Sequence, residues 1–558
     1  MGCEPFRIVE TGNGSTVKYN NRNLYSTRNP IQVVKKVLEA LVLQEKTLYF
    51  VPSPVLGHGL LDLLDSLPAE CHILSVEIDQ VLMRLLCTHG PQELLSHPQI
   101  TIVRTDDARH LVRILEDVGM WHFRRVRPVY LSGGYNLYRQ QYDAMQLSLE
   151  SALKTFWQNK RTLIAMGRLW VKNIFDNLSL LPYCASASAL KSTGPILVIG
   201  AGPSLENHLA TVKRAHGRAL ILAVDTAVPV LSEYGIVPDF IFTLESQYAN
   251  IYDFITSRPA GVPLIADLSS CPAILRLFEQ RIYLYSSRFF PLELFDRLSG
   301  FGLLPVPFPA LGSVGVAATH AALTVTEGPV ILIGLDFSYL RSQTHAKGTL
   351  HYIMMSMFAS RLEPFGNMSF ASIQSRPLLR LHDRKGSPIL SDLVLDSYAT
   401  QLAAIASAST RVFCFGQQGL PISERYVASE SELWEILPRK APTLIPAHTQ
   451  QASTRQVTAF LEQECAMLER SQVLLESLLA EGRRESRVLE HNEKTILAQT
   501  AYLFVHFPDP EPLPRFDRSF FKRALLAAAY YTDRLQRAKK LVANRQEDAM
   551  GPLPQIRA

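Results

Sequence analysis

The stretch Gly194–Glu206 constrains this chain more than any other, because it places a fully apolar strand directly before a glycine turn. Ile196–Ile199 shows no polar alternation, which is typical of a parallel strand covered on both faces. Gly200 and Gly202 form the turn, and Pro203 suits the first turn of a helix running to about residue 215. Such a turn lets a backbone approach a phosphate closely, although it also forms without any ligand.

Length and composition narrow the class of protein. At 558 residues, the chain is long enough for about three domains, and with 47% hydrophobic and 19% charged residues it is predicted to be globular. The net charge of +5 is small and dispersed, so no nucleic-acid partner is expected. No uncharged apolar run reaches the roughly 18 residues of a membrane span, and Met1–Arg7 lacks the apolar core of a signal peptide. The seven scattered cysteines contain no Cys-x-x-Cys pair, which favours a reducing cytoplasm.

Residues 1–190 are predicted to form a smaller N-terminal α/β domain. Glu77 and Asp79 follow its second strand, where an acidic residue can hold the ribose of a nucleotide or of S-adenosylmethionine. Pro52 and Pro54 stand in the first turn, where a cofactor would need glycines, so a structural or partner-binding domain is favoured. The predicted strands are 48–51, 72–76 and 99–103, followed by a helix over 142–181 and a Ser/Ala-rich linker over 185–193.

Residues 191–425 are predicted to form the central domain, a Rossmann-like sheet that carries the chemistry. Polar residues recur just after its strands or before its helices, and one such residue is usually only a cap or turn former. Five around one predicted sheet edge indicate a site: Ser204, Asp225, Glu245, Ser313 and Asp336. The further strands are predicted at 219–224, 240–244, 263–266, 282–285, 330–333 and 412–415.

Two histidines lie in polar loops of this domain. His345 stands in the loop Phe337–Gly348, which is long enough to be a functional segment, and it could act as acid or base near neutral pH. His382 stands in a polar turn over 381–388, before a helix at 392–406. A solvated loop histidine is the alternative for His345, and His351 is a weaker candidate.

Several motifs, in this order, resemble the motility accessory factor (Maf) family of bacterial flagellin glycosyltransferases. They are Gly200–Leu205, Asp225–Ala227, Pro238–Asp239 with Glu245, Gly334–Phe337 and Thr344–Gly348, preceded by Leu24–Pro30. The glycine and Gly-x-Asp-Phe elements are also similar to bacterial CMP-sialic acid sialyltransferases. The glycine-turn domain resembles archaeal pterin pyrophosphokinases too, so the fold alone does not fix the reaction.

The resemblance implies an α/β fold with a Rossmann-like central glycosyltransferase domain, and a cytoplasmic enzyme. Such an enzyme moves a nonulosonic acid of the pseudaminic or legionaminic type from a CMP-sugar to Ser or Thr of flagellin, in support of flagellar assembly and motility. We expect inversion at the anomeric carbon, no metal, and no cofactor besides the CMP-activated donor substrate. A non-catalytic flagellin-binding or chaperone-like protein on a decayed transferase fold is the alternative of a different class.

The resemblance also assigns roles to residues. His345 and His382 are rivals for the catalytic base, and His345 could instead assist the leaving group. The family more often has Asp at the position of Glu245, which leaves the donor sugar open. The residues implied in nucleotide-sugar binding are Gly200, Gly202, Pro203, Ser204, Leu205, Asp225, Thr226, Glu245, Ser313, Gly315, Asp336 and Tyr339.

Residues 426–558 are predicted to form a C-terminal helical domain. Helical apolar spacing extends over 456–479, 486–505 and 519–542, with a Pro-rich break at 508–514. A helical bundle with solvated charges is the simplest interpretation. A docking surface for a protein acceptor is the functional alternative, and it would include the basic residues Arg534, Arg537, Lys539 and Lys540.

Overall fold

The computed structural model describes most of the chain. The described residues are 6–255, 257, 260–278, 281–340, 342–439, 442, 444–446, 452–481, 489–508 and 516–550, with backbone alone for 444–446 and 545–550. Parts of some sequence expectations lie outside them. These parts are Met1–Pro5 at the start, Arg341 in the histidine loop, 486–488 of the second C-terminal helix and 509–514 of the Pro-rich break.

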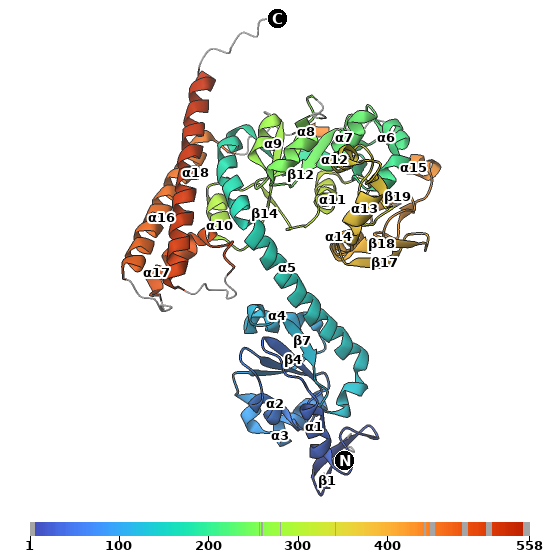
Figure 1. Cartoon of the computed structure of the whole chain (residues 1–558), viewed down its shortest axis with the longest axis vertical. Helices are drawn as coiled ribbons and strands as arrows, with labels where there is room; N and C mark the ends of the chain where they lie inside the picture. The colour runs from blue at the N-terminus through green and yellow to red at the C-terminus, as the bar shows by residue number, and fades with distance from the viewer. Residues whose placement is uncertain are drawn as a thin grey trace, which may run out of the picture. The chain divides into compact units, whose positions relative to one another are not determined.

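The chain divides into two compact units (Figure 1). Unit 1 comprises Met1–Ala165 and Phe507–Phe516, and unit 2 comprises Met166–His506 and Asp517–Ala558. The division falls inside the long helix α5 (Arg139–Asn177), so residues 166–190 group with unit 2. The three sequence domains 1–190, 191–425 and 426–558 stay predictions.

Unit 1 contains a four-stranded parallel sheet in the order β6-β5-β4-β7. The three strands predicted from sequence are confirmed, whereas the fourth was not anticipated because charged Arg125 and Arg127 interrupt its apolar pattern. An antiparallel sheet of three short strands precedes them. The elements are β1 (Phe6–Thr11), β2 (Gly14–Tyr19), β3 (Arg22–Asn23), α1 (Pro30–Glu39), β4 (Thr47–Pro52), α2 (Leu60–Asp65), β5 (His72–Glu77), α3 (Gln80–His89), β6 (Ile100–Arg104), α4 (Ala108–Val118) and β7 (Arg125–Pro128).

Unit 2 is built on a ten-stranded sheet in the order β15-β14-β13-β12-β11-β10-β16-β19-β20, with β8 also paired to β14. All of its strand pairs are parallel, which confirms the predicted α/β class. The strands are β8 (Ala185–Ser186), β10 (Ile196–Ile199), β11 (Leu220–Val224), β12 (Phe240–Thr243), β13 (Leu264–Asp267), β14 (Ile282–Ser287), β15 (Val306–Phe308), β16 (Val330–Ile333), β19 (Val412–Phe415) and β20 (Tyr426–Val427).

The chain reverses its direction across the sheet between β10 and β16. Strands β10 to β15 follow one another outward, and helix α11 (Val314–Val325) then carries the chain back to place β16 on the other side of β10. Both strands are fully buried, as their unbroken apolar sequences require. Ligands of open α/β sheets bind outside the carboxyl ends of the strands at such a reversal.

Two sequence expectations in unit 2 need correction. The helix expected from Pro203 breaks into a 3₁₀ turn (Pro203–Asn207) and α6 (Leu209–Ala215), and the break lets the His208 ring pack on Phe415 at 4.7 Å. The stretch expected to be a linker instead pairs in sheets, because β8 joins β14 and β9 (Leu190–Ser192) joins β21 (Leu444–Pro446). The polar turn predicted at 381–388 is confirmed, and the structure adds that it joins the two strands of a hairpin, β17 (Leu378–His382) and β18 (Pro388–Asp392).

The C-terminal region is helical, as predicted. It contains α16 (Thr454–Ala480), α17 (His491–Gln499) and α18 (Arg518–Met550), and the predicted second helix ends early because Ala501–Leu503 forms a 3₁₀ turn. Arg297 of α10 (Glu293–Gly300) binds the buried Glu464 of α16 through two hydrogen bonds of 2.9 and 2.7 Å. Among the described residues, no helix is long and apolar enough to cross a membrane.

Candidate active site at the carboxyl edge of the central sheet

The glycine turn after β10 lies directly against the loop after β16. The Gly202 N–H donates to the Gly334 carbonyl at 2.8 Å. A Cβ on Gly200 would lie 2.5 Å from the Gly334 oxygen, and a Cβ on Gly202 would lie 2.5 Å from Oδ2 of Asp336. Both glycines are therefore required for the two loops to approach each other, whether or not a phosphate binds there.

Ser204 and Asp336 join the same two loops. Ser204 donates its backbone N–H to Oδ2 of Asp336 at 2.8 Å and its hydroxyl to Oδ1 at 2.5 Å. Asp336 is buried, and burial raises the pKa of its carboxyl. Both of its carboxylate oxygens accept hydrogen bonds within the protein, so Asp336 stabilises the shape of the turn. The neighbouring turn residues Pro203 and Leu205 are also buried.

The start of helix α11 packs against the glycine turn and the loop after β16. A Cβ on Gly315 and a Cβ on Gly200 would each lie 2.4 Å from Cδ2 of Leu335, so the Leu335 side chain is wedged between them. Ser313 is the N-cap residue of α11, yet its side chain makes no capping hydrogen bond, and it is partly exposed. The first N–H groups of α11 therefore remain free of a side-chain cap at the sheet edge, where they can bind an anion.

Three carboxylates gather beyond β11 and β12. Asp225 is fully buried and accepts the Thr243 hydroxyl at 2.7 Å and the Thr226 N–H at 2.8 Å. Burial together with Asp225 raises the pKa of Asp253 to about 7. Burial and both other carboxylates raise the pKa of Glu245 to about 7 as well. The cluster therefore carries less negative charge near neutral pH than its composition implies.

Glu245 differs from the other members of this cluster because it is partly exposed. Its backbone N–H bonds the Thr243 hydroxyl at 3.2 Å, which fixes the start of the loop after β12. Burial, together with the charge of Glu245, raises the pKa of Tyr398, which packs against Gly312 just before α11. Glu245 can thus offer a carboxylate to a ligand, whereas Asp225 holds its neighbours in place.

The histidine loop is tied to the glycine turn. The Ala346 N–H donates to the Ala201 carbonyl at 2.9 Å, and the Lys347 N–H donates to the Glu206 carboxylate at 2.9 Å. This places His345 beside the turn, with its Nδ1 3.2 Å from the Thr344 hydroxyl. Its ring is 5.6 Å from that of His351.

The surroundings of His345 keep it neutral. Burial, with His351 and Arg376 nearby, lowers the pKa of His345 to about 4. A small pocket opens on this ring, and it is lined by Gln343, Thr344, His345, His351, Tyr352, Met355, Phe365 and Ser369. A neutral imidazole in a pocket can accept a proton.

Tyr339 stands near the start of the same loop and forms a hydrogen bond with Asp392. Its hydroxyl donates to Oδ2 of Asp392 at 2.5 Å, and Arg376 donates to the same oxygen at 3.1 Å. Asp392 also caps α14 (Leu393–Ser407) through the N–H groups of Val394 and Leu395. Burial and the bond to Asp392 raise the pKa of Tyr339 to about 12, so Tyr339 stays protonated.

His382 is placed differently. It ends β17 opposite Pro388, and its side chain is exposed at the hairpin tip. The structure thus joins the glycine turn directly to Asp336 and, through the backbone of Ala346, to the loop of His345, while His382 lies on the hairpin. Sequence reasoning missed Asp253, Arg376, Asp392 and Tyr398. Only Asp392 carried a signal, as an N-cap before a predicted helix.

Within the described parts of the chain, no group of three or more His, Cys, Asp or Glu is arranged to hold a metal ion.

The end of β4 in unit 1 is closely packed by protein side chains. A Cβ on Gly134 would lie 2.1 Å from the Ser53 hydroxyl, and the Tyr25 hydroxyl donates to the Pro54 carbonyl. Ser53 itself donates to the buried Glu77 at 2.8 Å.

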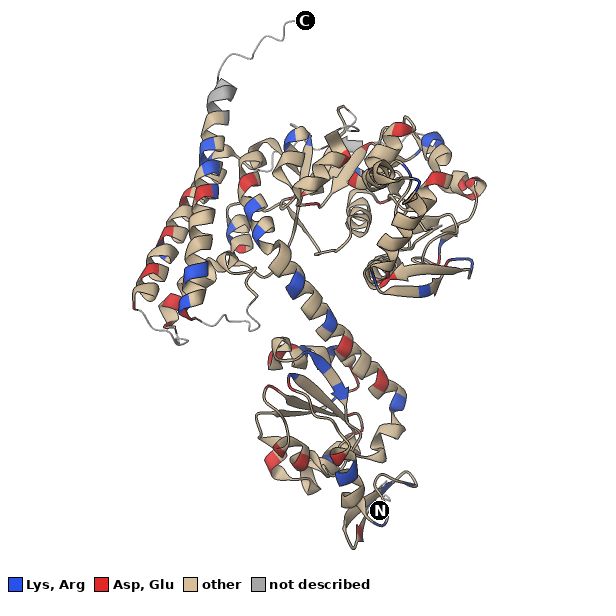
Figure 2. Ribbon diagram, in the orientation of Figure 1, with Lys and Arg blue, Asp and Glu red and all other residues tan. Residues whose placement is uncertain are grey.

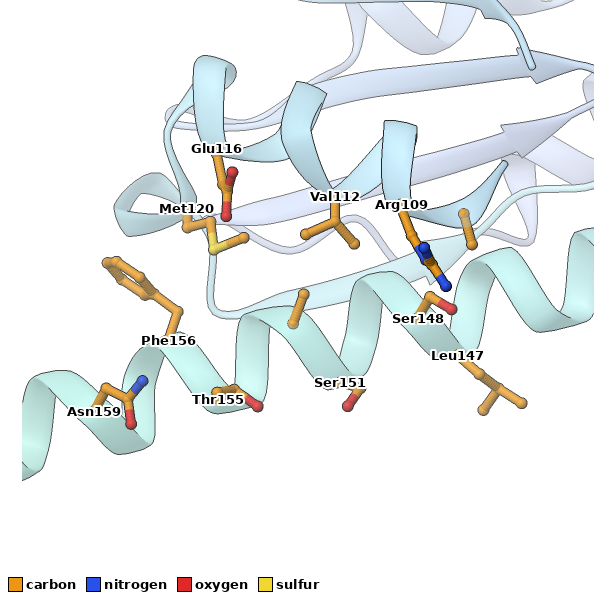
Figure 3. A pocket seen from close by; sticks show the side chains of 12 residues that line it. Arg109, Val112, Glu116, Met120, Leu147, Ser148, Ser151, Thr155, Phe156 and Asn159 are labelled. Atoms are coloured by element: carbon orange, nitrogen blue, oxygen red, sulfur yellow. The ribbon is translucent and has the colours of Figure 1, made fainter. Parts of the chain in front are cut away.

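Unit 1 has a pocket of about 720 Å³ between α4 and α5 (Figure 3). Val112, Met120 and Phe156 give it an apolar lining, with Arg109 and Glu116 along the α4 side. None of the residues predicted for the site lines this pocket.

The fold and this sheet edge together define a Rossmann-like α/β protein with its candidate site at the reversal of a doubly wound sheet. Comparison with known proteins agrees with that class. Residues 170–342 match the family model described as 6-hydroxymethylpterin diphosphokinase MptE-like. The structure of the MAf glycosyltransferase from Magnetospirillum magneticum AMB-1 aligns with 98% of this chain and 91% of its own, at a TM-score of 0.54 and 14% identity.

The sequence is also similar to proteins of Treponema pallidum (strain Nichols) that are described as uncharacterized. One is 28% identical over 96% of this chain and 95% of its own length. Another is 27% identical over 32% of this chain and 52% of its own length. The structural match shows the fold that this chain shares with a Maf glycosyltransferase.

Proposed function

We propose that this protein is a glycosyltransferase that moves a nonulosonic acid from a CMP-sugar to Ser or Thr of flagellin. The observation that carries the proposal is the junction of the glycine turn, the uncapped start of α11 and the His345 loop at one sheet edge. The fold shared with a Maf glycosyltransferase supports the same assignment.

The junction offers the two things that the reaction needs. When the anomeric C–O bond breaks, the electron pair stays on the CMP phosphate, and the free N–H groups at the start of α11 can stabilise that charge. The acceptor oxygen bonds the anomeric carbon from the opposite face, which inverts it. The hydroxyl proton passes to His345, whose imidazole is neutral at pH 7.

The remaining site residues have supporting roles in this proposal. Glu245 and Ser313 are partly exposed and orient the ribose or base. Asp225 and Asp336 position them by holding the loops after β11 and β16. Tyr339 fixes the His345 loop through Asp392.

The first test is a thermal-shift panel with CMP, CDP, UDP, GDP, S-adenosylmethionine and NAD. A ligand at a hundred times its dissociation constant stabilises a protein by about 2.7 kcal/mol, which such a scan detects. We expect a selective shift with CMP, followed by mass spectrometry of recombinant flagellin incubated with the CMP-sugar. A shift with S-adenosylmethionine instead would place the ligand site in unit 1.

A second candidate is a pterin pyrophosphokinase-like reaction, because residues 170–342 match the MptE-like model. That reaction transfers pyrophosphate from ATP to a hydroxymethylpterin. Incubation with ATP, Mg²⁺ and 6-hydroxymethylpterin distinguishes the two, since AMP and a pterin diphosphate form only in the second case. A flagellin-binding protein without activity would bind flagellin and form neither product.

A further inference from the structure

Helix α12 (Leu350–Phe358) is apolar, and yet none of its nine residues is buried. Met357 is 78% exposed, Phe358 is 72% exposed, and Leu362 just beyond the helix is 92% exposed. We call the exposed large apolar side chains of α12, of α13 (Phe365–Gln374) and of the segment between them the apolar patch. It consists of Ile353, Met354, Met357, Phe358, Leu362 and Phe370.

Several contacts hold the two helices of the apolar patch in place. Thr349 caps α12 by accepting the Tyr352 N–H, and the Tyr352 ring packs on Phe365 of α13 at 4.7 Å. Helix α13 is anchored by its buried residues Ser369 and Ile373, and the Ser369 hydroxyl bonds the Ser342 carbonyl at 2.5 Å. The exposed apolar side chains therefore lie on two helices that are held in place by these capping, ring and hydrogen-bond contacts.

Helix α12 also lines the candidate catalytic pocket, and Met354 and Phe358, three and seven residues after His351, lie beside that face of the helix. His351, Tyr352 and Met355 share that pocket with His345. The patch residues Met354, Met357 and Phe358 alternate with them along the same helix. A polypeptide lying on the patch is thus within one helix width of the pocket.

The charge of this segment limits what binds it. Between residues 350 and 375 the only charged side chains are Arg361 and Glu363, and α12 carries none (Figure 2). Four of the chain's 11 methionines, at 354, 355, 357 and 368, lie here. Methionine is enriched at surfaces that accept varied apolar partners, and contiguous exposed apolar side chains mark interaction sites. A neutral apolar surface complements an uncharged apolar partner and has no attraction for phosphate backbones or anionic lipids.

We propose that the apolar patch docks an apolar face of the acceptor polypeptide, so that a hydroxyl of that polypeptide reaches the pocket of His345. The inference rests on the proposed function, because it names how the same site selects its protein acceptor. Docking through α12 assigns acceptor binding to the central sheet domain, apart from the basic residues of α18.

The test is the double variant Met357→Lys with Phe358→Lys in the full-length chain. Both side chains are exposed, so the fold tolerates the change, and two charges oppose docking of an apolar face. The matched control is Val473→Lys with Leu526→Lys, which are 67% and 73% exposed on α16 and α18. Three quantities are measured: KM for recombinant flagellin monomer, the thermal shift with CMP, and the sedimentation coefficient of the free protein.

We expect at least a tenfold rise in KM for flagellin in the patch variant, an unchanged shift with CMP, and wild-type behaviour of the control. Wild-type KM in the patch variant would overturn the docking proposal while leaving the transferase assignment intact. A dimer that the patch variant dissociates, at unchanged KM, would show that a second copy of this chain covers the patch instead. Absence of transfer by the native protein would remove the proposed function and this inference together.

Discussion

Ser204 donates both its backbone N–H and its hydroxyl to the two carboxylate oxygens of Asp336, across 132 residues of sequence. The pair joins the turn after β10 to the loop after β16, where the sheet reverses its order. It decides the shape of the glycine turn, and therefore how that turn can present its backbone to a ligand.

Replacing Ser204 by Ala is expected to weaken CMP binding at least tenfold. The change leaves one oxygen of the buried Asp336 without its hydroxyl donor, which typically costs about 1–3 kcal/mol. Isothermal titration with CMP measures the effect. The exposed Ser232→Ala is the matched control, and equal CMP affinity in both variants would contradict the role assigned to the pair.

Gly202→Ala is expected to abolish the CMP shift and to lower the melting temperature. The new methyl group would lie 2.5 Å from Oδ2 of Asp336 and 2.7 Å from the Gly334 oxygen, so one of the loops must move. Gly300→Ala, where nothing lies within 4 Å of the added carbon, should behave as the parent protein. Differential scanning fluorimetry with and without CMP compares them. Normal binding by the Gly202 variant would show that the ligand does not use this turn.

His345→Ala is expected to reduce kcat at least a hundredfold while the CMP shift persists, because a positioned base contributes about that factor. The exposed His382→Ala should retain activity within a few fold. Because burial lowers the pKa of His345 to about 4, protonation of this imidazole should reduce the rate only as the pH falls toward 4. Any change between pH 6 and 8 should come instead from Glu245, whose pKa is raised to about 7 by burial and the nearby carboxylates. If the losses are exchanged between the two variants, His382 is the base.

Glu77 predicts a pH dependence for unit 1. Burial raises its pKa from 4.5 to about 7, so the folded state holds this proton more tightly than the unfolded state. The stability it contributes is full below pH 4.5 and is lost as the pH rises through about 7, a change of about 3 kcal/mol. Hydrogen exchange of β4 and β5 in the full chain should therefore quicken between pH 5 and 8, after correction for the intrinsic exchange rate. Glu77→Gln should remove this slope, and an unchanged slope would assign it to other groups.

Breaking the pair of Arg297 and Glu464 should destabilise unit 2 by about 3–5 kcal/mol, because it leaves a buried charge unpaired. Urea unfolding of Arg297→Ala measures this. Glu462→Ala, on the same helix but 61% exposed in its side chain, provides the control. A loss below 1 kcal/mol would mean that water compensates the pair.

The sequence alone determined the class of fold and most strands of the central sheet. Ile196–Ile199, Val330–Ile333 and Val412–Phe415 were predicted at their observed bounds, because strands buried on both faces are written as unbroken apolar runs. It also located Ser204, Asp225 and Asp336 at strand ends, where polar residues interrupt those runs. It failed for β7 and for the stretch 185–193, whose pairing depends on partners far along the chain. It also missed the strands of the local hairpin formed by β17 and β18.

Only the tertiary structure decided what each of these residues does. Asp225 and Asp336 have the same appearance in sequence as Glu245, but burial commits both aspartates to hydrogen bonds within the protein and leaves Glu245 partly exposed. His345 and His382 were equal candidates until the bond of Ala346 to Ala201 placed one beside the glycine turn. The sequence shows that α12 is apolar, and only the structure shows that none of its residues is buried. Local pattern fixes which residues form strands, whereas long-range contacts fix which side chains remain free for a ligand.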